Sequence, residues 1–197
     1  MTEAHAGNYT PEELQALGFR SVGNHVQIHR TVQIFGAANL TIGSHVRIDV
    51  FAVLSAGASG FTIEDHVHIA SNASILGAGA PVLLSAFSGV SPRATLFTST
   101  DDFSGGYLSG PTVPSEFTNV RSGPITLGRH AIVGAGSIVL PGVTIGTAAT
   151  VGALTLVKHD VEEFTIVAGN PLRVVGRRGD GLLELERELL ARERGTA

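Results

Sequence analysis

The chain has 197 residues, a formal net charge of −4 at pH 7 and only 15% charged residues. With 25 glycines and 6% aromatic residues, the composition favours short strands joined by tight turns and excludes a helical bundle. The slightly acidic balance, without clustered Lys and Arg, excludes a dedicated nucleic-acid binder, and the absence of cysteine excludes disulfides and zinc–cysteine sites.

Residues 1–20 are predicted to form an N-terminal segment with a short capping helix. Thr10 precedes Pro11, and Glu13 follows three residues after Thr10, which is the pattern of a capping box with proline at the first helical position. The N-terminus lacks the basic and apolar regions of a signal peptide, and the longest apolar run, residues 81–87, is too short to span a bilayer. We therefore expect no membrane contact and a cytoplasmic location.

Residues 21–178 contain a repeat in which an apolar residue returns every six positions. The six triplets are Val22, Ile28 and Ile34; Ile42, Ile48 and Leu54; Ile63, Ile69 and Ile75; Leu84, Val90 and Leu96; Leu127, Val133 and Val139; Ile145, Val151 and Val157. Their first members lie 18 to 21 residues apart except across one interruption, so each triplet is predicted to form one coil of three short strands. The sequence thus predicts an all-β solenoid of about six coils.

Histidines occur at two kinds of position in this repeat. Four of them lie three residues after the first apolar residue of a coil: His25, His45, His66 and His130. A position that recurs with the coil is predicted to be a turn position, and we expect no metal site. His68 differs, because its inward neighbours Val67 and Ile69 make it point outward from a flat strand. It is either a base or hydrogen-bond partner in a groove, or a plain exposed or interface histidine.

The 28 residues 97–124 interrupt the repeat, and a loop of this length inside a solenoid is usually functional. Asp101 and Asp102 stand near its start; they are either turn acids or a pair that holds a substrate ammonium and accepts its proton. The Tyr107 ring either stacks on a sugar or base or packs the loop. The candidate substrate-binding residues are Arg47, Phe103, Tyr107 and Glu116.

Residues 179–197 are predicted to form a C-terminal helix. Leu182, Leu185, Leu189 and Leu190 recur there at helical spacing among Glu and Arg. We expect this helix to pack on the solenoid or on a neighbouring subunit.

Over residues 9 to 178 the chain resembles the hexapeptide-repeat acyltransferases, which are left-handed parallel β-helices. The match is closest to the dTDP-4-amino-4,6-dideoxyglucose N-acetyltransferases of surface-polysaccharide pathways. The matching strings include Val67-His68-Ile69-Ala70, Ser99-Thr100-Asp101-Asp102-Phe103-Ser104-Gly105, Pro111-Thr112-Val113-Pro114 and Gly134-Ala135-Gly136-Ser137-Ile138-Val139-Leu140-Pro141-Gly142-Val143.

The resemblance implies the substrates and the residues that bind them. Acetyl-CoA is the implied acyl donor and a nucleotide-linked amino sugar the acceptor. Asp101 and Asp102 would recruit the sugar ammonium, and His68 would accept a proton. The residues implied to bind the cofactor are the small Gly134, Ala135, Gly152 and Ala153 at the pantetheine and the basic Lys158, Arg173 and Arg178 at the phosphates. The arginines are alternatively part of a solvated tail.

The resemblance also implies a homotrimer in which two chains share each active site. Outward apolar residues agree with this assembly, since apolar strand faces usually mark contacts. These residues are Val53, Ile132, Ile138 and Leu156.

Two other functions are weighed against the N-acetyltransferase. Galactoside and maltose O-acetyltransferases have a catalytic histidine near the start of the corresponding loop, where this chain reads Ser99-Thr100-Asp101-Asp102. An alcohol needs a base that removes its proton during attack, whereas a deprotonated amine attacks a thioester directly. A non-enzymatic scaffold would present regular Thr or Ser ladders, whereas we expect mixed outward columns.

Overall fold

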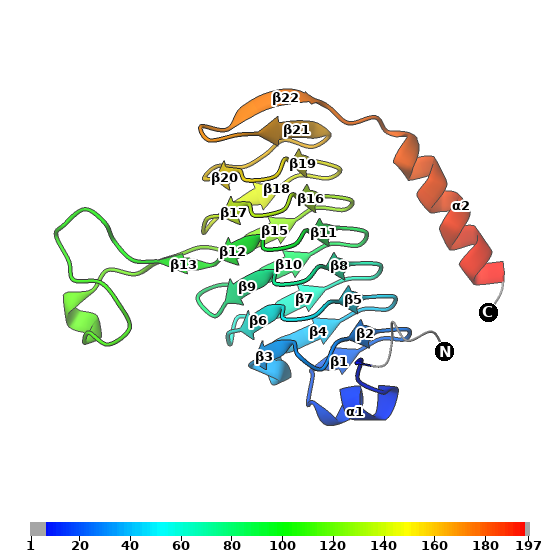
Figure 1. Cartoon of the computed structure of the whole chain (residues 1–197), viewed down its shortest axis with the longest axis horizontal. Coiled ribbons are helices and arrows are strands. Elements are labelled where there is room, and N and C mark those ends of the chain that lie inside the picture. Colours follow the sequence, from blue (N-terminus) through cyan, green and yellow to red (C-terminus); the bar gives the residue numbers. More distant parts are fainter. Residues whose placement is uncertain (1–6, 196–197) are drawn as a thin grey trace.

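The computed structural model describes residues 7–195 and forms a left-handed parallel β-helix with a helix at each end of the chain (Figure 1). Three parallel sheets form the sides of the rod. The β1 sheet stacks β1 (Ser21–Val22), β4 (Leu40–Ile42), β7 (Phe61–Ile63), β10 (Val82–Leu84), β15 (Ile125–Leu127) and β18 (Thr144–Ile145). The β2 sheet stacks β2 (Gln27–Ile28), β5 (Arg47–Ile48), β8 (His68–Ile69), β11 (Gly89–Val90), β16 (Ile132–Val133), β19 (Thr150–Val151), β21 (Thr165–Ala168) and β22 (Arg173–Arg177). The β3 sheet stacks β3 (Gln33–Phe35), β6 (Val53–Ala56), β9 (Ser74–Gly77), β12 (Thr95–Phe97), β17 (Ile138–Val139) and β20 (Leu156–Val157).

The core of the rod consists of the predicted hexads. Residues of successive coils stack in register, as Ile48, Ile69 and Val90 do in the β2 sheet. Strands in register lie about 4.8 Å apart, so each inward side chain packs on the one in the next coil. The inward corners hold small or β-branched residues that are buried: Val46, Ala52, Val67, Ala73, Ala94, Ala131 and Ala149. The predicted solenoid is therefore confirmed.

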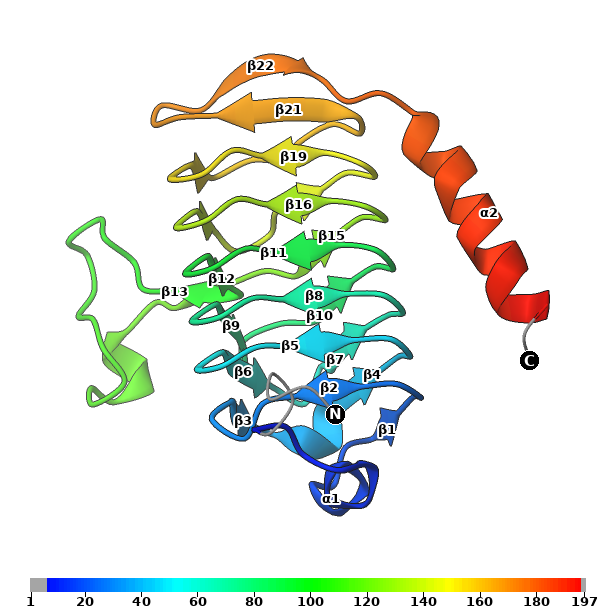
Figure 2. The ribbon, with the colours of Figure 1, turned by 45° about the vertical axis from the view of Figure 1, so that its right-hand side comes forward.

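The structure adds a partial seventh coil to the about six coils that the sequence predicts. Six coils have three strands each, but β21 adds a partial seventh coil above β19, and Val161 pairs with Ile145 beneath it. Val161 and Val167 are buried and lie six residues apart, but Val161 follows Val157 by only four residues, so the pair falls outside the six-residue phase of the last predicted triplet. The antiparallel β22 then covers the open edge of β21 (Figure 2).

The four recurring histidines lie at turns, as predicted. Each has a positive φ of 57–60°, the left-handed conformation that the corner between the β1 and β2 sheets requires. Phe87 occupies the same position in the fourth coil, and the rings stack along the rod with centroids 4.5–5.0 Å apart. We call His25, His45, His66, Phe87 and His130 the corner ladder.

The helix α1 (Pro11–Ala16) covers the N-terminal end of the rod. Its predicted capping box is present, because Thr10 accepts from the Glu13 backbone and the Glu13 side chain accepts from the Thr10 backbone. Leu14 is buried in the hydrophobic core. The helix therefore closes the first coil.

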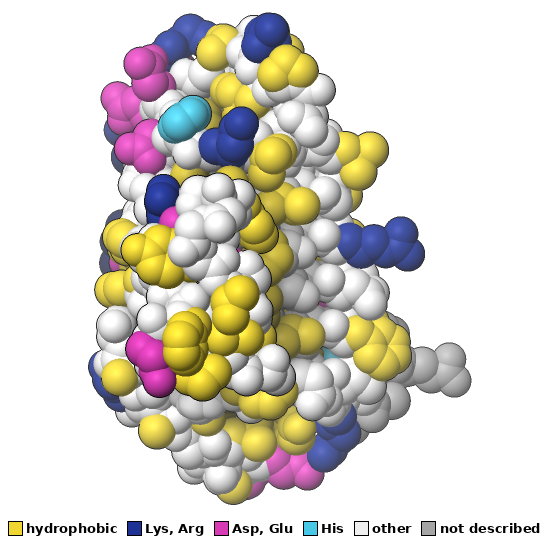
Figure 3. All heavy atoms as spheres, turned by 90° about the vertical axis from the view of Figure 1, so that its left-hand side faces the viewer, with side chains coloured by type: hydrophobic (Ala, Val, Ile, Leu, Met, Phe, Trp, Pro, Cys, Tyr) yellow, Lys and Arg dark blue, Asp and Glu magenta, His cyan; other side chains and the backbone are white. Residues whose placement is uncertain are grey.

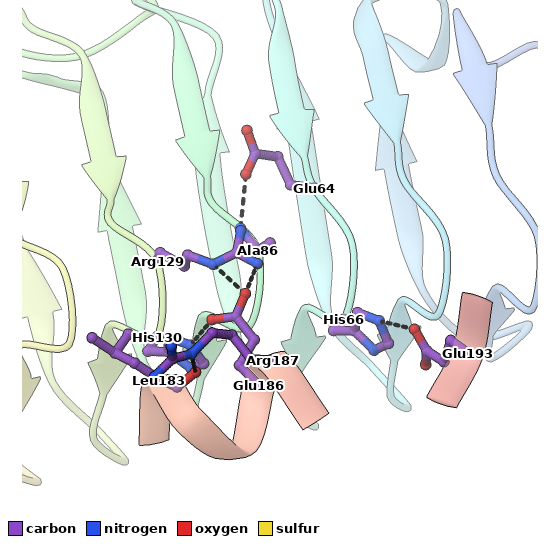
Figure 4. Close-up of polar contacts among 9 residues, drawn as sticks. All are labelled: Glu64, His66, Ala86, Arg129, His130, Leu183, Glu186, Arg187 and Glu193. Carbon is purple, nitrogen blue, oxygen red and sulfur yellow. Dashed lines mark hydrogen bonds and ion pairs between the residues drawn. The ribbon is translucent and has the colours of Figure 1, made fainter. Parts of the chain in front are cut away.

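The helix α2 (Gly181–Gly195) lies along the corner ladder, so of the two predicted packing partners the structure shows the rod (Figure 4). Glu186 accepts hydrogen bonds from Arg129 and lies 2.5 Å from His130 Nε2, and Glu193 lies 3.4 Å from His66 Nε2. Hydrogen bonds from Arg129 and His130 hold the pKa of Glu186 below its usual value, although partial burial opposes the shift. Polar contacts therefore dock α2, and none of its described side chains is buried.

One outward column differs from the expectation of mixed columns. In the β1 sheet it holds Ser21, Thr41, Thr62, Leu83, Thr126 and Thr144. β-Branched threonine suits a half-exposed strand, and Leu83 alone interrupts the hydroxyl row. Mixed outward columns are found on the other two sheets. No helix among residues 7–195 is long and apolar enough to cross a membrane.

Candidate active site

The inserted loop has an internal structure of its own. The strands β13 (Ser99–Thr100) and β14 (Arg121–Ser122) pair antiparallel and form a stem between β12 and β15. Beyond the stem the loop contains the 3₁₀ turn η3 (Ser115–Phe117). The 3₁₀ turn η2 (Ala37–Asn39) lies outside the loop, between the first two coils. The loop projects from the rod on the side away from α2 (Figures 1 and 2).

Asp102 holds the base of this loop together. Its side chain is only 3% exposed; Oδ1 accepts from the Ser104 backbone at 2.7 Å, and Oδ2 accepts from Asn119 at 2.8 Å and Arg121 at 3.2 Å. These hydrogen bonds, those from Ser104 foremost, lower the pKa of Asp102 to about 2. Both carboxylate oxygens are thus engaged within the loop.

Asp101 has a different environment from that of its neighbour. It is partly exposed and lines a hollow of about 430 Å³. The other lining residues are Ser99, Thr100, Gly110, Pro111, Val113, Ser115, Thr118 and Val120. Asp101 is therefore the acid of the pair that borders open space.

The predicted substrate-binding residues of the loop are exposed. The Phe103 residue is 84% exposed, and Tyr107 and Glu116 are also exposed. Figure 3 views the molecule from the side of the loop and shows hydrophobic side chains gathered over it. Leu108, Phe117 and Val120 belong to this exposed apolar group. Such a surface is typical of a contact with another molecule.

Asp49, a residue that the sequence analysis missed, joins two predicted residues of the β2 sheet, Arg47 and His68. Arg47 and His68 stand side by side on β5 and β8. Asp49 accepts from Arg47 Nε at Oδ1, 2.7 Å away, and its Oδ2 lies 2.8 Å from His68 Nε2. Asp49 lies two residues after Arg47, and residues at that spacing share one face of a strand. The two-residue spacing between Arg47 and Asp49 is the feature of the sequence that indicates Asp49 as a neighbour of Arg47.

The Asp49 carboxylate is arranged to remain charged. Partial burial would raise its pKa, but the hydrogen bonds from His68 and Arg47 outweigh burial and hold the pKa below its usual value. A charged carboxylate accepts hydrogen bonds, so it is the Nε2 atom of His68 that donates to Asp49, and Nδ1 is the ring nitrogen outside this contact. The His68 side chain is 52% exposed and is therefore reachable by a ligand.

A hollow of about 300 Å³ adjoins this cluster at the N-terminal side. Its lining residues are Asn8, Gln27, His29, Arg47, Ile48, Asp49, Val50 and Ser71. Arg47 is 62% exposed, and its two terminal nitrogens have no partner among the described residues. They are available to an anion, which a guanidinium binds through paired hydrogen bonds.

Within one chain the two parts of the predicted site are separate. Among residues 7–195, no hydrogen bond or ion pair joins the loop residues 101–116 to Arg47 or His68. The loop leaves the corner between the β3 and β1 sheets, whereas His68 lies on the β2 sheet. A single chain therefore does not bring Asp101 to His68.

The predicted pantetheine residues lie at turns of the C-terminal coils and have a packing role. A Cβ on Gly134 would lie 2.6 Å from the Ala153 backbone nitrogen, and one on Gly152 would lie 2.8 Å from the Ala168 side chain. Close stacking of coils thus requires both glycines. Ala135 and Ala153 follow them in the same turns.

The three predicted basic residues differ in their availability. Lys158 and Arg173 are exposed, beyond β20 and at the start of β22 respectively. Arg178 instead donates to the His130 carbonyl oxygen at 2.7 Å and so joins the C-terminal segment to the corner ladder.

His45, His66 and Glu193 are the described residues that come nearest to a set of metal ligands. Their ligand atoms lie within 4.8 Å of one another. The two imidazoles are stacked with an interplanar angle of 5°, so their lone pairs run parallel instead of converging on one point. A tetrahedral zinc ion needs ligand atoms about 2.0–2.2 Å from itself in converging directions. The geometry does not meet that need.

A left-handed β-helix with a long inserted loop and a polar cluster on a flat face fits the hexapeptide-repeat acyltransferases that the sequence resembles. No family model matches the chain. A dTDP-4-amino-4,6-dideoxy-D-glucose acyltransferase of Escherichia coli is 45% identical over 174 residues, which cover 88% of this chain and 90% of the relative. The chain therefore belongs to the dTDP-4-amino-4,6-dideoxyglucose acyltransferase family, which confirms the resemblance seen in the sequence.

Solved structures agree with this assignment. AntD, an N-acyltransferase from Bacillus cereus in complex with dTDP and 3-hydroxybutyryl-CoA, is 36% identical with a TM-score of 0.90, over 95% of this chain and 98% of AntD. A single-residue variant of AntD in complex with dTDP-4-amino-4,6-dideoxyglucose and coenzyme A has the same identity and TM-score, over 94% of this chain and 97% of that one.

Proposed function

We propose that the chain transfers an acyl group from coenzyme A to the amino group of a dTDP-linked 4-amino-4,6-dideoxyglucose. The observation that carries this proposal is the likeness, over nearly the whole chain, to an N-acyltransferase bound to that sugar nucleotide and to coenzyme A. The sequence predicts acetyl as the acyl group. A neighbour with 3-hydroxybutyryl-CoA bound makes the longer acyl group a second donor to test.

The reaction needs an amine without its extra proton. Asp101, facing the hollow of the loop, pairs with the sugar ammonium and orients it, while Asp102 keeps the loop in shape. His68 Nδ1 accepts the proton directly or through water. The amine nitrogen then bonds to the thioester carbonyl carbon, the carbon–sulfur bond breaks, and the coenzyme A thiolate takes up the proton that the nitrogen loses. Backbone N–H groups of the late coils stabilise the oxyanion.

The acyl donor lies along the C-terminal coils in this proposal. Its pantetheine runs past Ala135 and Ala153, and its phosphates meet Lys158 and Arg173, which are exposed. Arg178 is the weakest of the predicted phosphate ligands, because its guanidinium already binds the His130 carbonyl.

We propose further that the protein is a homotrimer whose sites lie between chains. The loop of one chain projects away from its own His68 and presents an exposed apolar surface, which fits a contact with a neighbour (Figure 3). Outward Ile138 on the β3 sheet is also exposed. Sedimentation should give three times the 20.4 kDa of the chain, and a fully active monomer would refute this arrangement.

The activity is tested by thiol release from acyl-CoA with a panel of amino and hydroxy sugars linked to nucleotides. We expect turnover of the amino sugar and none of its hydroxy analogue. Turnover of the hydroxy sugar alone would indicate an O-acyltransferase, and no turnover of either sugar would indicate a scaffold.

Two variants test the proposed residue roles by steady-state kinetics. Asp101→Asn should raise the sugar KM or abolish turnover, and His68→Asn should cause a partial loss of activity. Both kinetic constants staying within about twofold would remove the residue concerned from the mechanism.

A mixing experiment tests whether two chains share a site. When Asp101→Asn and His68→Asn chains are co-expressed, mixed trimers contain some sites with both native side chains. We expect activity above that of either variant alone. Activity equal to the average of the two would place both residues in one chain.

A cytoplasmic location and a role in surface-polysaccharide synthesis remain predictions. Cell fractionation would check the first, and polysaccharide analysis of a deletion strain would check the second.

A further inference from the structure

Gly89 stands at an outward position of the β2 sheet where the fold does not require glycine. The outward column runs Gln27, Arg47, His68, Gly89 and Ile132 through five coils. A Cβ built on Gly89 would approach nothing closer than the His68 carbonyl oxygen, 3.9 Å away, and Gly89 is not among the residues with positive φ. An alanine would therefore fit without strain.

Most turn glycines of the rod differ from Gly89 in this respect. Gly134 must be glycine, because a Cβ there would lie 2.6 Å from the backbone of the next coil. Among strand glycines of residues 7–195, Gly77 would meet Ser55 and Val82 at 2.8 Å, and Gly176 lies in the antiparallel edge strand beside a register shift. Gly89 lies in the middle of a regular parallel sheet.

A glycine in such a strand lowers stability, because it loses more backbone entropy than other residues and contributes no side chain to packing. Where packing and backbone conformation do not demand it, one known use of such a glycine is to let a ligand or another backbone approach closely. The sheet surface at Gly89 therefore carries no side chain. We call this position, which lies between the imidazole of His68 and the side chain of Ile132, the bare strip.

The neighbours of this strip indicate which molecule approaches. On its N-terminal side Asp49 holds His68 and Arg47 in place, with contacts of 2.8 and 2.7 Å. The terminal nitrogens of Arg47, which have no partner within residues 7–195, adjoin the hollow of about 300 Å³. Those donors suit the diphosphate of a sugar nucleotide. On the C-terminal side lie the coils proposed to hold coenzyme A.

We propose that Gly89 forms the floor on which the hexose ring of the nucleotide-linked amino sugar lies, beside His68. This inference rests on the proposed function. The strand β11, which contains Gly89, belongs to the same coil as β12, from which the inserted loop leaves the rod. In a parallel three-fold assembly a neighbour's loop, with Asp101, thus lies at the same height along the rod as this floor.

The test compares Gly89→Ala and Gly89→Val with the wild type by steady-state kinetics, varying each substrate in turn. The added methyl groups lift the ring from its position, and a displacement of about 1 Å can cost about 100-fold in rate. We expect kcat/KM for the sugar nucleotide to fall about tenfold for Gly89→Ala and about 100-fold for Gly89→Val, with the KM for acyl-CoA unchanged within about twofold. The Tm should be equal to or above that of the wild type.

Two controls separate this proposal from its alternatives. Ser21→Val places bulk at an outward position of the β1 sheet and should leave the kinetics unchanged. Wild-type turnover of the amino sugar in the same assay tests the proposed function by itself. Unchanged sugar kinetics in Gly89→Val, or a rise confined to the KM for acyl-CoA, would overturn the assignment. Loss of the trimer in sedimentation of either Gly89 variant would also overturn the assignment, because it would show that a neighbouring subunit packs over Gly89.

Discussion

Ser88 is a buried polar group that should destabilise the protein. Its side chain points into the rod, stacked between Val67 and Ala131 of the adjacent coils, and the residue is 2% exposed. Its Oγ has no hydrogen-bond partner among the described residues. A hydroxyl that is removed from water without a replacement partner costs about 1–3 kcal/mol. We therefore expect the Ser88→Ala variant to be more stable than the wild type.

The size of the gain follows from what the substitution removes. Alanine eliminates the desolvation cost and forfeits only the dispersion contacts of one oxygen, each worth about 0.1–0.2 kcal/mol. The net gain should be about 1–2 kcal/mol in the free energy of unfolding. For a chain of this length each kcal/mol shifts the Tm by about 2–4 °C, so the Tm should rise by several degrees.

Ser137 provides the matched control, because it is a buried serine with both hydrogen bonds made. Its Oγ donates to the Gly152 carbonyl at 2.8 Å and accepts from the Thr155 backbone at 3.1 Å. Ser137→Ala leaves these groups unsatisfied and should cost about 1–3 kcal/mol. The assay is thermal unfolding of both variants at one protein concentration, since the Tm of an oligomer depends on concentration. An unchanged or lower Tm for Ser88→Ala would refute the reasoning.

Two further predictions concern the polar contacts that hold the loop and α2. The pKa of Asp102, about 2 in the folded chain against an ordinary 3.8, means that its stabilisation of the loop is fully present above about pH 4 and is lost as the pH falls toward 2. Asp102→Asn should weaken the contact with Asn119 and speed tryptic cleavage in the loop at pH 7; equal cleavage rates would contradict this role. Glu186→Gln removes the carboxylate that pairs with Arg129 and contacts His130, so amide exchange in residues 181–195 should accelerate while the core stays protected. Unchanged exchange in α2 would show that other contacts hold the helix.

Local patterns account for the parts of the fold that the sequence predicted correctly. The hexad period places one apolar residue per strand in the core, whatever the rest of the chain does. The capping box at Thr10 and Glu13 and the turn histidines such as His66 likewise depend on neighbours only a few residues away. The loop strings around Asp101, together with the hexads, indicated the family that the comparisons confirmed.

Contacts between coils could not be predicted, because they join residues about 20 positions apart through the register of stacked strands. Asp49 meets His68 only because the β5 and β8 strands pair in register, and Asp102 is buried only because the loop folds back on it. The seventh coil at Val167 was missed because its triplet is incomplete.

The amino-acid sequence by itself thus determined the rod, its end cap, the position of the loop and the family, since each of these depends on short-range periodicity or on matching strings. Only the tertiary structure decided, among residues 7–195, which carboxylate borders a hollow, which glycine leaves the sheet surface uncovered and which serine lacks a hydrogen-bond partner. Those properties are set by the distance and direction between side chains of different coils, which a period along the chain does not encode.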